Sequence, residues 1–346
     1  MANTTVADVP AARDLVHELN DYRKPDRMRS LFELAVTVIP FVVLWGLMYL
    51  SLSVSYWLTL LLAFPAAGFL VRLFLIQHDC GHGSFFKRRA TNDWVGRFLG
   101  VFTLAPYDYW RRTHAIHHAT SGNLDERGIG DIDTLTVKEY LALSRWKRLG
   151  YRVYRNPLVM FGIGPIYVFA LQFRLPVRLL NEGWWPWASA MSTNLGIVVT
   201  AGLMMWLIGI FNFLAIFLPV TMIATSFGVW LFFVQHQFEE TTWEEEDDWN
   251  VHDAALHGSS FYDLPGVLRW LTANIGMHHV HHLCSRIPFY RLPEVLRDYP
   301  ELTSVGRITL IESLKCVRLV LWDEAARKLI TFSELRNREN LSAAAA

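Results

Sequence analysis

The chain has 346 residues, of which 52% are hydrophobic and only 18% are charged. Soluble domains carry about 25% charged residues, so this composition argues against an ordinary soluble domain. The 32 basic and 32 acidic residues balance, so overall charge gives no reason to expect nucleic-acid binding. The three cysteines, Cys80, Cys284 and Cys316, are too far apart in sequence for a CxxC metal site and predict no disulfide framework.

Two long stretches, residues 34–71 and 183–238, contain no Asp, Glu, Lys or Arg. A membrane-spanning helix needs about 20 apolar residues, so each stretch can hold two spans joined by a short turn. A large soluble helical core is the alternative, but its helices would keep a polar stripe, and residues 41–64 show none. The sequence therefore predicts an all-α, polytopic membrane protein with spans near 34–51, 56–76, 188–208 and 213–235.

Lysine and arginine are absent from the two expected outer turns, residues 51–55 and 209–212, and are frequent in the remaining segments. Because basic residues stay on the cytoplasmic side, both termini are predicted to be cytoplasmic. The polar, charged first thirty residues or so predict no cleavable signal peptide. The predicted divisions are a cytoplasmic N-terminal segment (1–33), two helical hairpins under a cytoplasmic helical cap (34–300) and a cytoplasmic C-terminal tail (301–346).

Two further segments, residues 93–107 and 157–173, are apolar but interrupted by Gly or Pro. Such segments can lie in the plane of the membrane interface or enter the membrane partway. The sequence leaves both arrangements open for each segment.

Most of the 13 histidines gather in three clusters, all on the predicted cytoplasmic side. Histidines spaced i, i+4 or i, i+3, i+4 lie on one face of a helix, so their rings can converge. Neutral imidazole is the commonest metal ligand among side chains. The candidate ligands are His78 and His82 in the first cluster, His114, His117 and His118 in the second, His278, His281 and His282 in the third, and His236 at the end of the last span.

Eight or nine imidazoles are too many for one ion, because even octahedral coordination takes six ligands. Two metal ions are therefore expected, with each HxxHH turn giving rings to both. Spacing alone is equally compatible with a redox pair of irons and with two zinc sites that would support hydrolysis. No cysteine partners the clusters, which disfavours Fe–S and Cu(I) sites. His17, His252 and His257 are expected to be ordinary polar residues, and His279 is expected to point away from the metals.

The sequences HDCGH, HAIHH and HHVHH, in this order around two predicted hairpins, resemble the three histidine boxes of the integral-membrane fatty acid desaturases. The flanking residues 114–140 and 233–290 are similar to bacterial and cyanobacterial acyl-lipid desaturases. The resemblance implies that residues 34–300 form a desaturase domain, with four spans under a cytoplasmic cap in the bacterial inner membrane. It also implies that all nine candidate histidines bind two irons and that Asn274, near the third box, can hold a metal-bound water.

The reaction implied by the resemblance is O2-dependent insertion of a cis double bond into a lipid-linked acyl chain, with the delta-12 position favoured over omega-3 and delta-5. A hydroxylase or ketolase on the same scaffold and a zinc-dependent membrane hydrolase are the alternatives. A metal transporter is disfavoured, because its ligands should lie between the spans. Unactivated methylenes resist acid–base chemistry, so the protein must hold the right carbons beside the oxidant in an apolar channel. Candidate lining residues are Trp110, Phe161, Tyr167, Phe233 and Trp270.

Two electrons per turnover must come from a separate donor, because the sequence contains no cytochrome b5 module, dinucleotide-binding fingerprint or ferredoxin cysteine set. In a bacterial setting the expected donor is ferredoxin. Acidic residues considered as hydrogen-bond partners of the ligand rings are Asp79, Glu239, Glu240 and Asp253. A basic surface that could dock an acidic donor, or equally meet anionic lipid, would comprise Arg88, Arg89, Arg111, Arg112, Lys147 and Arg148.

Overall fold

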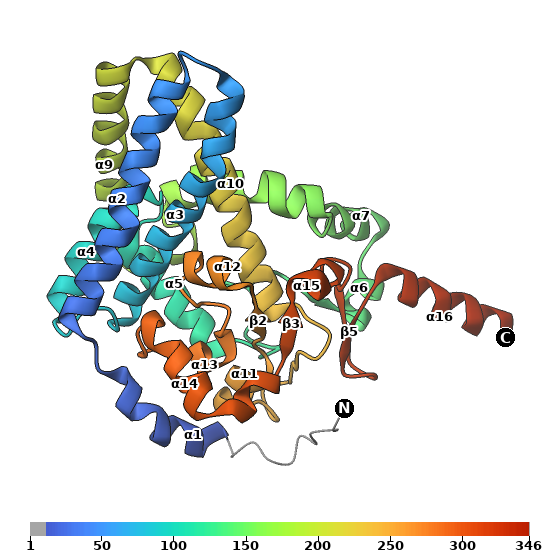
Figure 1. The fold of residues 1–346 in the computed structure, drawn as a ribbon. Coiled ribbons are helices and arrows are strands. Elements are labelled where there is room, and N and C mark those ends of the chain that lie inside the picture. Colours follow the sequence, from blue (N-terminus) through green and yellow to red (C-terminus); the bar gives the residue numbers. More distant parts are fainter. Residues whose placement is uncertain (1–11, 346) are drawn as a thin grey trace.

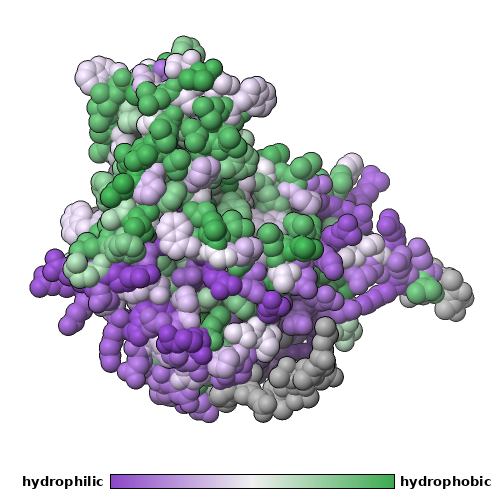
Figure 2. Space-filling model, in the orientation of Figure 1, coloured by the Kyte–Doolittle hydropathy of each residue, from purple (hydrophilic) through white to green (hydrophobic). Residues whose placement is uncertain are grey.

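The computed structural model describes residues 12–345, so the first eleven residues of the predicted N-terminal segment and Ala346 lie outside the described residues. All four of its longest, most apolar helices could cross a membrane by length and hydropathy. Hydrophobic residues cover the tall part that these helices form, and hydrophilic ones cover most of the broader base (Figure 2). The predicted four-span, mainly helical fold is confirmed. The spans are α2 (Arg27–Ser51), α3 (Tyr56–His82), α9 (Trp185–Ile208) and α10 (Ile210–His236) (Figure 1).

Each helix contains its predicted span and extends beyond it. α2 begins well before residue 34, because the Asp26 side chain caps it by accepting a hydrogen bond from the Arg29 amide at 2.7 Å. α3 continues beyond residue 76 and stops where Gly83 takes a left-handed φ of 72°. Two charged residues lie inside the spanning helices, Glu33 in α2 and Arg72 in α3, and their side chains pair with each other.

α3 is the central helix of the four. It packs against α2 and against α10, and more than half of its most apolar stretch is buried, whereas almost all of the corresponding stretch of α9 faces outward. The small residues Ala63, Ala66 and Ala67 are buried on α3 and let the neighbouring helices approach closely. α3 and α10 both continue into the base of the molecule, so the histidines at their ends reach the same region.

The base consists of shorter helices around the ends of α3 and α10 (Figure 1). α4 and α5 pack against both α3 and α9, and α11 packs against α13. Short 3₁₀ segments join several of these helices. The helices are α1 (Ala12–Glu18), α4 (Arg89–Phe102), α5 (Tyr107–Thr120), α6 (Val137–Ala142), α7 (Arg145–Tyr154), α8 (Gly164–Ala170), α11 (Val251–His257), α12 (Gly266–Leu271), α13 (His278–Leu283), α14 (Leu292–Asp298), α15 (Leu310–Cys316) and α16 (Phe332–Ala345).

Two small sheets in the base were not predicted. β1 (Leu135–Thr136) runs parallel to β4 (Leu321–Asp323), which pairs antiparallel with β5 (Lys328–Ile330). β2 (Phe261–Asp263) runs parallel to β3 (Arg307–Thr309). Strands of two or three residues are too short for an alternating hydrophobic pattern to show in the sequence. The two sheets attach the C-terminal residues to the base. The predicted divisions at residues 33 and 300 stay predictions.

The two interrupted apolar segments both form helices at the side of the bundle. Residues 93–107 include most of α4, on which Trp94 and Phe98 are exposed. Residues 157–173 include a π-helical turn (Val159–Ile163) and α8, which pack against α10. α7 and the following segment Val159–Arg174 meet at a bend of 60°.

Gly96 lets α4 pack closely against Tyr107 at the start of α5. A Cβ at this position would overlap the ring of Tyr107. That ring cannot easily move, because its hydroxyl lies 2.8 Å from the Cys80 carbonyl and 2.9 Å from the Asp93 carboxylate. We expect Gly96→Ala to lower the free energy of unfolding by about 1–3 kcal/mol through overpacking, measured by unfolding in detergent. Gly202→Ala on α9, where nothing lies within 4 Å of the new Cβ, should leave stability unchanged or raise it slightly; equal effects of the two changes would contradict this account.

Candidate metal centre

The first group of histidines brings five rings together from three helices. His78 and His82 come from α3, His114 and His118 from α5, and His281 from α13. One nitrogen of each ring lies within 4.8 Å of the matching nitrogen of every other ring. The Nε2 atoms of His82 and His114 are 3.1 Å apart, as are those of His114 and His118, and those of His118 and His281 are 3.2 Å apart. Five ring nitrogens therefore surround one common centre.

The second group brings four rings together from α5, α10 and α13. They are His117, His236, His278 and His282, all buried. The Nε2 atom of His236 lies 3.2 Å from that of His117 and 3.0 Å from that of His278. Because α10 continues to His236, the last spanning helix contributes directly to this group.

Neighbouring rings are divided between the two groups by the rotation of the helix. Consecutive residues of an α-helix point about 100° apart, so His118 faces the first group while His117 faces the second. α13 divides His281 and His282 in the same way. The rings of His118 and His282 stack with their centroids 4.0 Å apart, so the two groups lie side by side. All nine histidines predicted as ligands meet in these two groups.

The chemistry of these groups suits metal ions. Burial lowers the pKa of His114, His118, His281 and His282 well below the ordinary histidine value, so these rings are neutral at neutral pH. Neutral rings that direct lone pairs at one point repel one another unless a cation lies between them. The buried Nε2 of His282 also has no hydrogen-bond partner in the described part of the chain. A metal ion in each group would satisfy these nitrogens.

Comparison with known proteins supports the same conclusion. The sequence pattern of the fatty acid desaturase family matches residues 54–307, well over half of the chain. A fatty acid desaturase of Bacillus subtilis (strain 168) is 46% identical over 325 residues, which cover 94% of this chain and 92% of that protein. The chain belongs to the fatty acid desaturase family. The enzyme is therefore an oxidoreductase of lipid metabolism.

Two cyanobacterial relatives are more distant from this desaturase. An sn-1 acyl-lipid omega-3 desaturase (ferredoxin) of Synechocystis sp. is 31% identical over 235 residues, 64% of this chain and 61% of that protein. An sn-1 oleoyl-lipid 12-desaturase of the same organism is 29% identical over 238 residues, 63% of this chain and 62% of that protein. The similarity to both relatives is thus limited to about two thirds of each chain.

Asp131 holds one ring of the desaturase's second group. The Nδ1 of His117 donates a hydrogen bond to the Asp131 carboxylate at 2.5 Å, which leaves Nε2 free to face the centre of the group. Asp131 was missed in the sequence. The sequence signal for it is the glycine-rich stretch GIGD, residues 128–131, shortly after the second cluster. Gly130 has a φ of 82°, and a Cβ there would come within 3.0 Å of the His117 Cβ, so this turn passes close to His117 and brings Asp131 beside it.

Asp79 is the predicted acidic partner that does lie at the site. The Nδ1 of His78 is 3.4 Å from one Asp79 oxygen, and the Phe289 amide donates to the other at 2.7 Å. Asp79 therefore ties the end of α3 to the loop after α13. Glu239, Glu240 and Asp253 make no hydrogen bond to a histidine of either group within the part of the chain that the structure describes.

The structure places the other predicted residues outside the two groups. The buried His279 ring faces the Leu302 carbonyl at 3.0 Å, and burial lowers its pKa to about 4. His17, His252 and His257 belong to neither group. The Asn274 amide donates to the Phe289 carbonyl at 3.1 Å, and its role in holding a metal-bound water stays a prediction.

Aromatic side chains cover the histidines on the side of the spanning helices. Trp110, one of the predicted channel residues, stacks on His114 with the centroids 4.6 Å apart. Phe232 of α10 lies 5.1 Å from the rings of both His117 and His236. By contrast, Trp270 packs on Arg72, and the predicted channel residue Tyr167 is exposed. Trp110 and Phe232 thus place apolar surface next to the candidate metal centre.

Replacing Asp131 by Asn tests its role as a positioning residue. The neutral amide oxygen accepts the His117 Nδ1 proton more weakly than the carboxylate does, so the ring should be held less firmly in this orientation. We expect metal affinity to fall by about 10–100-fold, as for other outer partners of ligand histidines, measured by metal titration of the purified enzyme. Asp133→Asn, an exposed neighbour on the same loop, should leave the affinity unchanged; an equal loss in both variants would point to general loop damage instead.

Proposed function

We propose that the nine histidines hold two iron ions and that the enzyme uses O2 to insert a cis double bond into an acyl chain of a membrane lipid. His78, His82, His114, His118 and His281 would hold one iron. His117, His236, His278 and His282 would hold the other. The observation that carries this proposal is the convergence of all nine ring nitrogens in two adjacent groups.

The size of the first group supports iron over zinc. Five donors exceed the four positions of a tetrahedral zinc site. Zinc-dependent hydrolysis is also inconsistent with the family to which the chain belongs.

The side chains around the histidines determine how the substrate meets the oxidant. When bound, the irons would supply, together with O2, the oxidising power to remove two hydrogens from adjacent methylenes. Asp131 and Asp79 orient His117 and His78, so that each ring presents a fixed nitrogen. Trp110 and Phe232 keep the adjoining space apolar, which excludes water and favours an acyl chain over a polar substrate.

The names of the relatives support a lipid-linked substrate and a ferredoxin donor. The Synechocystis relatives are named as acyl-lipid desaturases, one acting on oleoyl-lipid at position 12 and one with ferredoxin. We propose an oleoyl chain of a membrane lipid as substrate, position 12 as the new double bond and ferredoxin as donor. The distribution of basic residues favours a cytoplasmic metal centre, with both termini on the same side of the bacterial inner membrane.

The function can be tested by expressing the chain, with ferredoxin and its reductase, in a bacterial host that makes oleoyl but no polyunsaturated lipids. Gas chromatography–mass spectrometry with double-bond localisation should detect a diunsaturated chain with its new bond at position 12. Metal analysis of the purified enzyme should find about two irons per chain.

Each other result has a defined meaning. A new double bond at the omega-3 or delta-5 position would support desaturation but contradict the proposed position 12. Hydroxyl or keto products would show that the enzyme is a hydroxylase or ketolase built on the same scaffold. No new product in the presence of a working donor, or zinc in place of iron, would contradict the proposal.

A further inference from the structure

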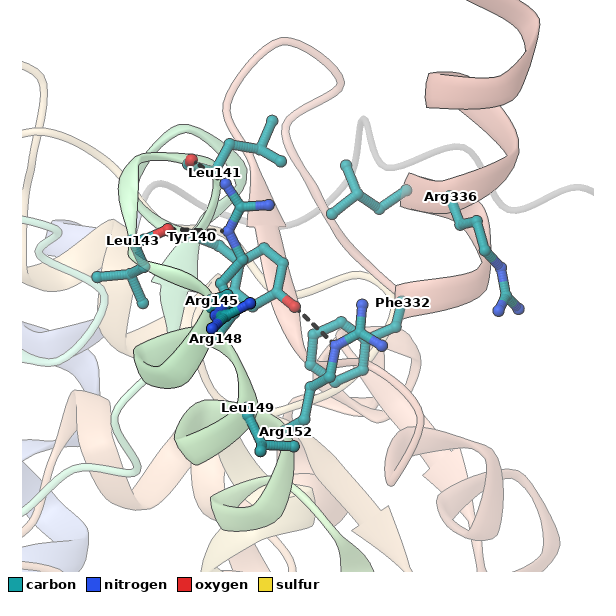
Figure 3. A pocket seen from close by; sticks show the side chains of 10 residues that line it. Tyr140, Leu141, Leu143, Arg145, Arg148, Leu149, Arg152, Phe332 and Arg336 are labelled. Atoms are coloured by element: carbon teal, nitrogen blue, oxygen red, sulfur yellow. Dashed lines mark hydrogen bonds between the residues drawn. The ribbon is translucent and has the colours of Figure 1, made fainter.

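A pocket of about 490 Å³ lies between α7 and α16, well apart from the histidines (Figure 3). Guanidinium groups and hydrophobic side chains share its walls, and no carboxylate lines it. The close view shows arginines of α7 together with the ring of Phe332 and the side chain of Arg336 from α16. The wall residues used below are Arg145, Arg148, Arg152, Arg336, Leu149 and Phe332.

Among the side chains that the structure describes, no carboxylate forms a salt bridge with any of the four guanidinium groups of this pocket. By contrast, Arg89 pairs with Asp93 at 3.0 Å and Arg112 with Glu182 at 3.5 Å on the surface predicted to dock a donor. Positive charges gathered around one hollow repel one another, so an anion in the hollow would be stabilised.

Two of the four groups are held in place by the fold. The Nε of Arg152 donates to the Tyr140 hydroxyl at 2.7 Å, and its guanidinium lies 4.9 Å from the centre of the Phe332 ring. The Nε of Arg148 donates to the Leu143 carbonyl at 3.0 Å. An arginine that is already ordered loses little side-chain entropy when it binds a phosphate through its planar fork. Arg145 and Arg336 are exposed at the rim of the pocket, where the Arg145 guanidinium lies 5.2 Å from the centre of the Trp146 ring.

α7 carries an apolar stripe beside its basic one. Trp146, Leu149 and Val153 are 68%, 50% and 50% exposed, and their spacing puts them along one side of the helix. The arginines at 145, 148 and 152 repeat this spacing one residue earlier. A helix with adjacent apolar and basic stripes is typical of the membrane interface.

The surroundings of α7 place it beside the membrane. It leads through Leu158, which is 82% exposed, into the π-helical turn and α8, and both pack against the spanning helix α10. α7 lies farther out on the same side, beyond the π-helical turn and α8, with α16 below it in the same view (Figure 1). Hydrophobic and hydrophilic residues adjoin on this projection (Figure 2). A bilayer around the four spanning helices would therefore bring its headgroups close to this pocket.

We propose that this pocket binds the phosphate of an anionic phospholipid, while the apolar stripe of α7 packs among the acyl chains of the same leaflet. Its volume is in the range of small-molecule sites, about 300–1,000 Å³, whereas a protein partner needs an interface of about 800 Å² on each side. Arginine binds phosphate oxygens through two parallel N–H donors. The site is separate from the proposed reaction and would anchor the base of the enzyme to the membrane surface.

The test uses the full-length, iron-loaded protein in a neutral detergent. Soluble short-chain phosphatidylglycerol is titrated in, and its dissociation constant is compared with that of phosphatidylcholine of the same chain length. The test variant is Arg145→Gln with Arg336→Gln, because neither side chain has an acidic partner within the described chain. The matched control is Arg286→Gln with Arg318→Gln, which removes the same charge at exposed positions that do not line the pocket. Iron content checks that both variants fold.

We expect phosphatidylglycerol to bind more tightly than phosphatidylcholine, and the test variant to weaken phosphatidylglycerol binding about tenfold. The control variant should stay within about twofold of the unmodified protein. Equal weakening in both variants, or none in either, would overturn the proposal. So would inorganic phosphate that binds as tightly as the lipid, which would indicate a site for a free anion. A loss of ferredoxin affinity with unchanged lipid binding would instead assign the pocket to the electron donor.

Discussion

A chain with His118→Ala should reach the membrane in normal amounts but form no detectable new double bonds. Its Nε2 lies 3.1 Å from that of His114 and 3.2 Å from that of His281, and its ring stacks on His282 of the second group. Removing it would therefore disturb both groups at once. We expect metal content to fall and desaturation to drop by more than about 100-fold, beyond the loss typical of an outer partner. Lipid profiling of the expression host and metal analysis of the purified protein measure the two effects.

The same loss of activity is expected for His78→Ala, His114→Ala and His282→Ala. The matched control is His252→Ala on α11, which belongs to neither group and should keep both metal and activity. Normal activity in any of the four test variants would remove that residue from the proposed ligands. A loss of iron in His252→Ala would show that the assignment of the groups is incomplete.

Glu33→Gln should destabilise the protein by about 3–5 kcal/mol, because it leaves a buried arginine without its carboxylate partner. The side chains of Glu33 and Arg72 are 2% and 1% exposed, and they pair between α2 and α3. The Arg72 guanidinium also donates to Thr37 at 3.0 Å and to the Trp270 carbonyl, and its centre lies 4.2 Å from the Trp270 ring. The pair therefore links two spanning helices to the segment that leads into α13. Chemical unfolding in mixed micelles measures the loss.

Two further variants separate the buried charge from other causes. The double change Glu33→Gln with Arg72→Met removes both charges and should recover a large part of the lost stability, because no unpaired charge stays buried. Glu294→Gln breaks the surface pair with Arg291, which is 2.9 Å long, and should cost about 1 kcal/mol or less. If Glu33→Gln cost no more than Glu294→Gln, the pair would not stabilise the contact between the helices.

The sequence alone was enough to predict the spans and the candidate ligands, because both depend on local patterns. A run of about 20 apolar residues without charge must avoid water whatever surrounds it, so the spans near 34–51 and 188–208 could be placed directly. Histidines three and four residues apart share a helix face by backbone geometry alone. The eight histidines of the three clusters could therefore be chosen before any contact between the clusters was known, and His236 was added from its place at the end of the last span.

Features that depend on contacts between distant residues were not visible. The pairing of Glu33 with Arg72 could not be seen, because the two residues lie on different helices and 39 positions apart in the sequence. Asp131 is separated from His117 by a glycine-rich turn, and only the path of that turn brings the two side chains together. The small sheets pair strands such as Phe261–Asp263 and Arg307–Thr309, which are far apart in the sequence.

By itself the sequence determined that this is a membrane protein with four spans and three histidine clusters, because hydropathy and helical spacing are properties of neighbouring residues. Only the tertiary structure decided that the rings divide into groups of five and four, that Asp131 holds His117, and that arginines of α7 and α16 gather around one pocket. Those features arise where helices distant in sequence meet, and packing rather than local pattern determines which side chains face one another there.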